Sequence, residues 1–454
     1  MADGGNSSLS NVTCAALQQA PESSQCFAVN PADDSSGFLF ALMAIFAGLV
    51  TRSLTRMIPS NISCPPYTVL MFLFGVGFDR WGPTAGILAS SMDSWKGTHP
   101  NFILFILVPP LLFESSFNVN WGVFRNLIPS SILLAGPGVL FSTVLTALLI
   151  KPVIMNWVEF PLECALLLGA ISSATDPVAV VAVLKDLGAP ARLSMLVEGE
   201  SLLNDGTAVM LFVVFLQLVK NDNEDETHLT PEFLLWSLAR IGGVALAWGL
   251  SMAAVTYYWV KAFKDVTIDI TVLIIGVFLT FYVAEHVLHV SGILAIVVYG
   301  LFLARNKSFA MDAHTAEENA GVWEEAAFLS NTFIFALAGL IISDRTGLID
   351  DSVAYIGVSV VLYILCSLVR VLMVVGLFPV MHYLGYGLTS KEATMLTFSG
   401  LRGAISLALA LLVEQSEDVG RWLCTSDVWC AQLPPPHTRS SCSALPSQPW
   451  RSRS

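Results

Sequence analysis

Charged residues are scarce in this chain. Of its 454 residues only 13% are Asp, Glu, Lys or Arg, whereas 55% are hydrophobic and the mean hydropathy is +0.69. Water-soluble domains do not contain so many uncharged apolar runs of membrane-spanning length, so the composition excludes that class and predicts an all-α polytopic membrane protein. The formal net charge of −13 says little about partners, because much of the acid falls in two short stretches, 222–226 and 312–325, that we expect to be polar, solvated loops.

Other signals are missing as well. No run of basic residues indicates nucleic-acid binding, and the eight cysteines lack the CxxC and Cys/His spacings of a zinc site. The first 37 residues lack the basic start of a cleaved signal peptide. No nucleophile or metal-binding motif lies within an apolar run, which leaves an intramembrane hydrolase with little support, and we expect no cofactor.

Twelve apolar segments follow the polar residues 1–37, and we expect each to span the membrane as a helix within one membrane domain, residues 38–417. The segments are Phe38–Ile58, Pro66–Phe78, Phe102–Phe117, Leu127–Ile150, Leu162–Leu184, Leu193–Val219, Phe233–Val260, Ile268–Val287, Ser291–Ala304, Ala326–Ser343, Val353–Leu384 and Ala393–Val413. Residues 418–454 are rich in Pro and Ser without a helical or strand period. They predict either a disordered tail or an aberrant end to a sequence that naturally stops near Glu417, and we favour the second.

Basic residues between the segments predict the orientation. Ten fall on one side of the membrane: Arg52, Arg56, Arg125, Lys185, Arg192, Lys261, Lys264, Arg305, Lys307 and Lys391. Five fall on the other: Arg80, Lys96, Lys151, Lys220 and Arg345. Because cytoplasmic loops carry the excess of Lys and Arg, the first side is predicted to be cytoplasmic and the N-terminus to lie outside.

Two of the segments contain helix-breaking sequences at membrane depth. In the fifth segment Asp176 precedes Pro177, and proline removes a backbone donor and pushes the residue before it out of the helical region. In the twelfth segment Gly400 and Gly403 flank Arg402. Two broken helices in corresponding halves of a chain are typical of inverted-repeat transporters, whose substrate site lies near the bilayer midplane.

The sixth segment carries acidic residues at membrane depth, where a carboxylate is costly unless it is paired, protonated or bound to a cation. At about 100° per residue, Glu200 and Asn204 share one helix face, and Ser201 and Asp205 share the next. The second pair predicts an oxygen site for a hard cation, completed by the carbonyl or hydroxyl of Thr175 and by water.

Asp205 is the residue that we expect to carry an exchange of cation for proton. A buried carboxylate holds one or the other but not both, so competition for it couples the two movements in opposite directions. Asn204 is neutral, and with a single exchanging carboxylate the cycle is electroneutral. The competing interpretation is a buried carboxyl group that is hydrogen-bonded to a neighbouring helix.

Glu200 faces away from Asp205 and needs a partner of its own. Arg370, in the middle of the eleventh segment, is the best available one, and we interpret the pair as structural. Asp176 and Arg402 are expected to compensate the charges of the helix ends at the two breaks.

Glu114, at the end of the third segment, has two interpretations of equal weight. It is a water-mediated cation ligand at the mouth of the cavity, or it is an interfacial carboxylate capped by Ser115 or Ser116.

The runs SSATDPVAVVAVLKDLGAPARLSMLVEGESLLNDGTAV, PPLLFESSF and GLRGAISLALAL resemble sodium/proton antiporters of the monovalent cation/proton antiporter-1 type. The salt-overly-sensitive and sperm-type exchangers are the nearest likeness. The resemblance covers Phe38 to Glu414, and it implies an inverted-repeat fold of thirteen spanning helices with two crossing breaks, a homodimer and an elevator-like core domain. By residue match it also implies roles for particular residues. Asn204 and Asp205 match the family's Asn-Asp pair, and Ser201, Thr175 and Glu114 match further ion-site residues. Glu200 and Arg370 match a buried ion pair, and Asp176 and Arg402 match the charges at the two breaks.

The implied partners are Na⁺ and H⁺, membrane lipid and a second copy of the chain, with K⁺ or Li⁺ as the near alternative to Na⁺. The resemblance favours the plasma membrane, and an endomembrane fits the physics equally well. The sequence lacks the family's thirteenth helix and its usual cytoplasmic regulatory region. A truncated, non-transporting subunit that regulates a full-length exchanger is therefore a second functional alternative.

Overall fold

The computed structural model describes residues 31–57, 65–82, 87–96, 102–154, 161–177, 180–181, 183–184, 187–221, 231–347, 352–383 and 387–414. Within these ranges every regular element is a helix and none is a strand; α denotes an α-helix and η a short π-helical segment. Eight of the described helices are long and apolar enough to span a membrane, and three shorter apolar helices accompany them. The prediction of an all-α polytopic fold is confirmed.

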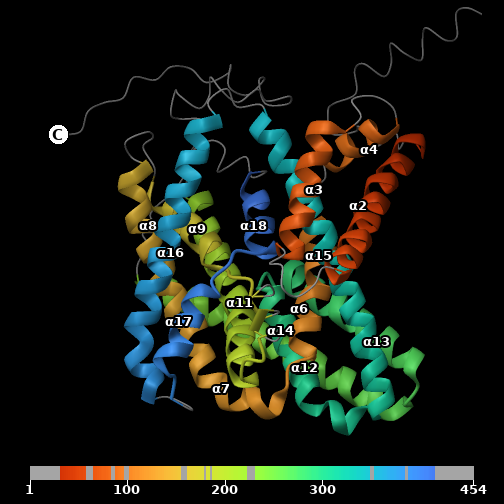
Figure 1. Ribbon diagram of the computed structural model, residues 1–454. Helices are drawn as coiled ribbons and strands as arrows, with labels where there is room; N and C mark the ends of the chain where they lie inside the picture. The colour runs from red at the N-terminus through yellow and green to blue at the C-terminus, as the bar shows by residue number, and fades with distance from the viewer. Residues whose placement is uncertain are drawn as a thin grey trace, which may run out of the picture.

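The elements are α2 (Pro31–Met57), α3 (Tyr67–Trp81), α4 (Ile87–Lys96), η3 (Ile103–Leu107), α6 (Val108–Phe117), α7 (Trp121–Leu133), η4 (Leu134–Gly138), α8 (Val139–Ile154), α9 (Leu162–Ser173), α11 (Ala191–Asn221), α12 (Pro231–Phe263), α13 (Val266–Tyr282), η5 (Val283–Val287), α14 (Gly292–Ala310), α15 (Ala313–Gly347), α16 (Ser352–Tyr383), α17 (Ser390–Phe398) and α18 (Ala404–Glu414). Apart from terminal residues, eleven of the twelve predicted segments fall on one of these helices or on consecutive ones. The fifth, Leu162–Leu184, begins on α9 but leaves it at Ser173, and residues 178, 179 and 182 within it lie outside the described residues. Figure 1 shows α2, α3, α4 and α15 gathered on one side of the molecule and α8, α9, α16 and α17 on the other, with α11 and α18 between them.

The prediction that residues 312–325 form a loop is wrong, because α15 already begins at Ala313. Its polar N-terminal turns extend the apolar part of the helix, and two of their carboxylates pair with an arginine of another helix. Glu324 and Glu325 each lie 3.7 Å from the guanidinium of Arg52 on α2. The other stretch expected to be a loop, 222–226, lies outside the described residues.

Helix α4 is an element that the apolar pattern missed, because its ten residues are too short and too polar for a spanning segment. It lies against the first half of α2, where Ser91 Oγ accepts a hydrogen bond from the backbone N–H of Phe40 at 2.9 Å. Trp95 Nε1 donates to the carbonyl of Gly37 at 2.6 Å. These bonds explain why the short helix is held beside α2.

Helices α3 and α15 cross at very close range. A Cβ on Gly75 would meet the backbone carbonyl of Ala336, and a Cβ on Gly339 would meet that of Phe72. Small residues at a helix crossing let the two backbones approach each other, which is how membrane helices gain packing energy without a hydrophobic driving force.

The two ends of the helix bundle carry different charges. Arg305 lies over the ring of Trp121 at 5.6 Å and Lys307 over that of Phe117 at 4.1 Å, so that the basic end of α14 meets the turn between α6 and α7. The charge count assigned Arg305, Lys307 and Arg125 of α7 to one side, and these contacts bring α14 and the start of α7 together.

At the other end, the ammonium of Lys96 lies 2.8 Å from Asp79 and 2.9 Å from Asp344. Burial alone lowers the pKa of this ammonium, but the hydrogen bonds to the two carboxylates and their charges outweigh burial and raise it. Lys96 thus remains charged at neutral pH and ties α4 to α3 and α15.

Both predicted helix breaks are present, and they contact each other. Helix α9 ends at Ser173 and the chain continues without helical structure through Pro177, while α17 and α18 are separated by residues 399–403. The backbone N–H of Asp176 donates to the carbonyl of Leu401 at 2.7 Å. The prediction of two broken, crossing helices is confirmed.

Candidate functional site

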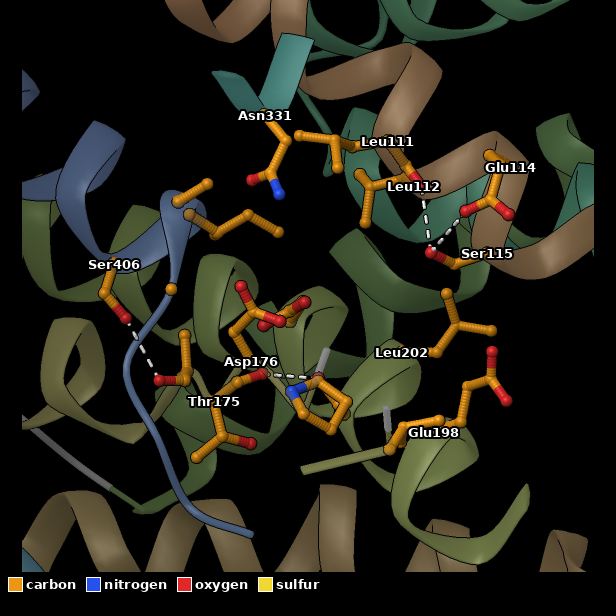
Figure 2. A pocket seen from close by; sticks show the side chains of 18 residues that line it. Leu111, Leu112, Glu114, Ser115, Thr175, Asp176, Glu198, Leu202, Asn331 and Ser406 are labelled. Atoms are coloured by element: carbon orange, nitrogen blue, oxygen red, sulfur yellow. Dashed lines mark hydrogen bonds between the residues drawn. The ribbon is translucent and has the colours of Figure 1, made fainter. Parts of the chain in front are cut away.

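A cavity of about 340 Å³ lies beside the crossing point of the two breaks. Four sets of elements line it: α6, α11, the break after α9 with the start of α18, and α15, which contributes Asn331. Figure 2 shows Glu114 and Ser115 on one side of the cavity, Ser406 on the other, and Asp176 between them. The lining carries the carboxylates of Glu114, Asp176, Glu198 and Asp205.

Ser201 and Asp205 both line this cavity, as their shared face on α11 predicts. The hydroxyl of Ser201 donates to the carbonyl of Thr175 at the break, which leaves the hydroxyl oxygen free to act as a ligand. The Asp205 side chain is buried, with 9% of the residue exposed, and its carboxylate accepts no hydrogen bond from the described part of the chain. A hydroxyl, a carbonyl and a carboxylate thus converge from two elements, and such oxygens suit a hard cation.

Asn204 points away from the cavity. Its Nδ2 donates to the carbonyl of Ser173 at 3.0 Å and to the hydroxyl of Thr175 at 2.9 Å. Asn204 therefore holds the end of α9 and the start of the break. Unlike the other four predicted ion-site residues, Asn204 does not line the cavity, although it is bonded to one of them, Thr175.

Glu200 and Arg370 meet in a bidentate ion pair, with two nitrogen–oxygen distances of 2.7 Å. The side chains are only 2% and 9% exposed. Arg370 also donates to the carbonyl of Leu396 on α17 at 3.1 Å. The pair connects α11 to α16 and α17, and a parallel pair of charge-assisted hydrogen bonds holds their relative orientation.

Glu114 combines features of both of its interpretations. It lines the cavity, and it accepts hydrogen bonds from Asn118 Nδ2 at 3.1 Å and from Ser115 Oγ at 3.5 Å. Ser116 instead donates to the carbonyl of Phe113 at 3.1 Å. A carboxylate held in this way at the edge of the cavity can still reach a cation through water.

Each of the two break charges lies beside a helix end of the other break, whereas the sequence predicted that each would compensate the helix ends at its own break. Arg402 donates to the carbonyl of Ala174 at 3.4 Å, directly after the carboxyl end of α9. The side chain of Asp176 packs against Gly403, directly before the amino end of α18. A cation beside a helix C-terminus and an anion beside an N-terminus are the favourable arrangement.

Among the cavity residues that were not predicted as site residues, three have polar side chains that the sequence analysis did not consider: Glu198, Asn331 and Ser406. Glu198 lies on the same α11 face as Ser201 and Asp205, so the helical period could have found it. Asn331 on α15 and Ser406 on α18 carry no such signal, because only the packing of distant helices brings them to the cavity.

The site can be compared with those of known proteins. Residues 38–428 match the family described as sodium/hydrogen exchanger, transmembrane. The chain is 36% identical to sodium/hydrogen exchangers 7 and 8 of Arabidopsis thaliana, over 88% of this chain but only 35% and 52% of the two relatives. It is 31% identical to the Na⁺/H⁺ antiporter ApNhaP of Aphanothece halophytica, over 82% of this chain and 67% of that relative. The chain thus spans about a third and about half the length of the plant relatives.

The fold is similar to that of the sodium proton antiporter MjNhaP1 from Methanocaldococcus jannaschii. The TM-score is 0.65 and the alignment covers 87% of this chain and 91% of the other. At 18% sequence identity this likeness shows the fold alone.

Proposed function

Because this chain belongs to the sodium/hydrogen exchanger family, we propose that it exchanges Na⁺ for H⁺ across a membrane, with Asp205 holding either the cation or the proton. The observation that carries the proposal is the buried Asp205 carboxylate, which lines a cavity and accepts no hydrogen bond from the described residues. A carboxylate at this depth is stable only as the acid or beside a cation, so its two occupants exclude each other.

Sodium is held in this mechanism by oxygen atoms from two elements. Asp205 supplies the charge, Ser201 and Thr175 supply neutral oxygens, and water supplies the rest of the shell. Glu114 acts from the edge of the cavity through water. When the cation leaves, a proton from the cavity takes its place on Asp205, so one positive charge replaces another and the cycle is electroneutral.

The position of the cavity supports alternating access. Leu112 of α6 and Asn331 of α15 line one part of it, and Asp205 of α11 with the two breaks lines the rest. Sliding of the α11 part, held together by the Glu200–Arg370 pair, against α6 and α15 exposes Asp205 to the two sides in turn. This elevator-type movement and the homodimer implied by the resemblance are parts of the proposal.

The experiment that tests the proposal measures cation-driven pH change in vesicles that contain the purified chain. Na⁺, K⁺ and Li⁺ are added in turn to the chain and to the Asp205→Asn variant. We expect a Na⁺ response that falls to the protein-free background in the variant. Asp269→Asn is the control, because Asp269 is another buried carboxylate but does not line the cavity, and it is expected to keep the response.

The outcomes separate the alternatives. A response to K⁺ or Li⁺ without one to Na⁺ would replace sodium as the substrate while keeping Asp205 as the carrier. A Na⁺ response that survives in Asp205→Asn would refute the proposed role of Asp205. Without any response from a folded sample, independent exchange by this chain would be refuted. The regulatory alternative then predicts an effect on a full-length exchanger that is the same with Asp205→Asn.

A further inference from the structure

A second, much smaller cavity lies on the other face of α11. It has a volume of about 20 Å³ and is lined, among others, by Thr146, Ser173, Asn204, Arg370 and Gly400. The Asn204 side chain points to this face of α11, while Ser201 and Asp205 point to the larger cavity. The two cavities are thus separated by α11 and by the break after α9.

Two residues of this small cavity have a buried polar atom without a partner among the described residues. They are the amide oxygen Oδ1 of Asn204 and the guanidinium nitrogen Nε of Arg370. The residues are only 1% and 8% exposed, and their other polar groups are bonded to protein. A buried donor or acceptor without a partner costs about 1–3 kcal/mol, so a pair of them around one cavity indicates an occupant.

The chemistry of the two atoms limits what the occupant can be. Asn204 Oδ1 needs a hydrogen-bond donor, and Arg370 Nε needs an acceptor. An anion offers no donor and a metal cation offers no acceptor, so a small molecule with both functions is required. A water molecule needs roughly 10–15 Å³ of such space, which the cavity provides.

Gly400 keeps the space beside Arg370 open. A Cβ at this position would come within 3.1 Å of Arg370 Nε and within 3.2 Å of its Cγ. Any other residue would therefore press on the same nitrogen that has no protein partner. The absence of a side chain at the break leaves Nε accessible to the cavity.

We propose that one buried water molecule occupies this cavity and bridges Asn204 Oδ1 to Arg370 Nε. The water connects the Glu200–Arg370 ion pair of α11 and α16 to the amide that holds the break after α9. Asn204 is then a positioning residue, bonded on one side to Ser173 and Thr175 and on the other, through water, to Arg370. The inference does not depend on which cation is transported.

X-ray radiolytic footprinting read by mass spectrometry tests the proposal, because radicals formed from a bound water oxidise the side chains next to it even when bulk water does not reach them. Met373 lines the cavity and is 2% exposed, while Met381 on the same helix is 0% exposed and does not line it. During millisecond exposure of the folded chain, we expect Met373 to be oxidised several-fold faster than Met381. Equal, background-level oxidation of the two methionines would overturn the proposal.

A variant provides the second measurement. Asn204→Leu keeps a side chain of similar size but removes the acceptor, so the water loses a partner; it also removes the hydrogen bonds that Nδ2 donates to Ser173 and Thr175. We expect the ratio of Met373 to Met381 oxidation to fall towards one in this variant. An unchanged ratio in a folded sample would show that the water is not held by Asn204, and the comparison within the unsubstituted chain remains decisive if the variant does not fold.

Discussion

At the scale of single residues, burial decides how much a charge matters to this protein. Glu200 is paired in a 2%-exposed position, whereas Glu324 is paired with Arg52 while 68% of its side chain is exposed. Removing one member of a buried ion pair leaves the other as an uncompensated buried charge, whereas the remaining member of an exposed pair is solvated by water. Breaking the Glu200–Arg370 pair is therefore expected to destabilise the protein more than breaking the Glu324–Arg52 pair, although both pairs join separate helices.

We expect Glu200→Gln to lower the free energy of unfolding by about 3–5 kcal/mol, because Arg370 is left buried without its counter-charge. Glu324→Gln is the matched substitution, and we expect it to cost at most about 1 kcal/mol. Thermal unfolding of the two variants in the same detergent measures the difference. Similar losses in both variants would mean that the buried pair does not stabilise the fold as its geometry indicates.

At the scale of the elements, the two breaks are in close contact where they cross. Residues 174–177 and 399–403 are both without helical structure, and a backbone hydrogen bond joins them. Gly403 is required there for a steric reason, since a Cβ would run into the Cβ and carboxylate of Asp176. The site thus depends on a small residue at the start of α18.

Gly403→Ala should force the two breaks apart and cost about 1–3 kcal/mol in stability, as overpacking does, together with a loss of Na⁺-driven exchange. Gly243→Ala is the control, because a Cβ at Gly243 on α12 meets nothing within 4 Å. Within a helix, the substitution of this glycine by alanine is expected to leave stability unchanged or to raise it by about 0.5–1 kcal/mol. Full activity and unchanged stability in Gly403→Ala would contradict the close contact at the crossing.

At the scale of the whole molecule, the unequal charge of the two ends predicts how the protein lies in the membrane. Lys391 lies exposed at the start of α17, on the side that is rich in Lys and Arg. Asp93 on α4, whose side chain is 74% exposed, lies on the opposite side beside Lys96. The excess of positive charge marks the cytoplasmic side.

We therefore expect Asp93→Cys to react with a membrane-impermeant maleimide in intact cells, and Lys391→Cys to react only after the cells are permeabilised. The unsubstituted chain, measured in parallel, accounts for its own cysteines. The reverse pattern would mean that the molecule lies the other way round and that the positive charges did not determine its orientation.

The sequence by itself determined the apolar helices, both breaks and the division of α11 into two polar faces, but not the short polar helix α4. These features depend on local rules. The length of the apolar runs predicts the spanning helices, Pro177 and Gly403 predict the breaks, and the helical period places Ser201 and Asp205 on one face. The partner of Glu200 was also predictable, because a buried carboxylate needs a cation and Arg370 was the best placed one at membrane depth. The start of α15 was not, since its polar turns are stabilised by Arg52 from another helix.

The tertiary structure alone decided what surrounds the carboxylate of Asp205. Asn331 and Ser406 reach the cavity, and Asn204 bonds to the break, because helices far apart in the sequence pack at particular crossing points. Helical periodicity gives the direction of a side chain relative to its own axis but not which neighbour it meets. For this reason the candidate carrier residue could be named from the sequence, while the shape of the cavity and the small hydrated space behind α11 required the packed molecule.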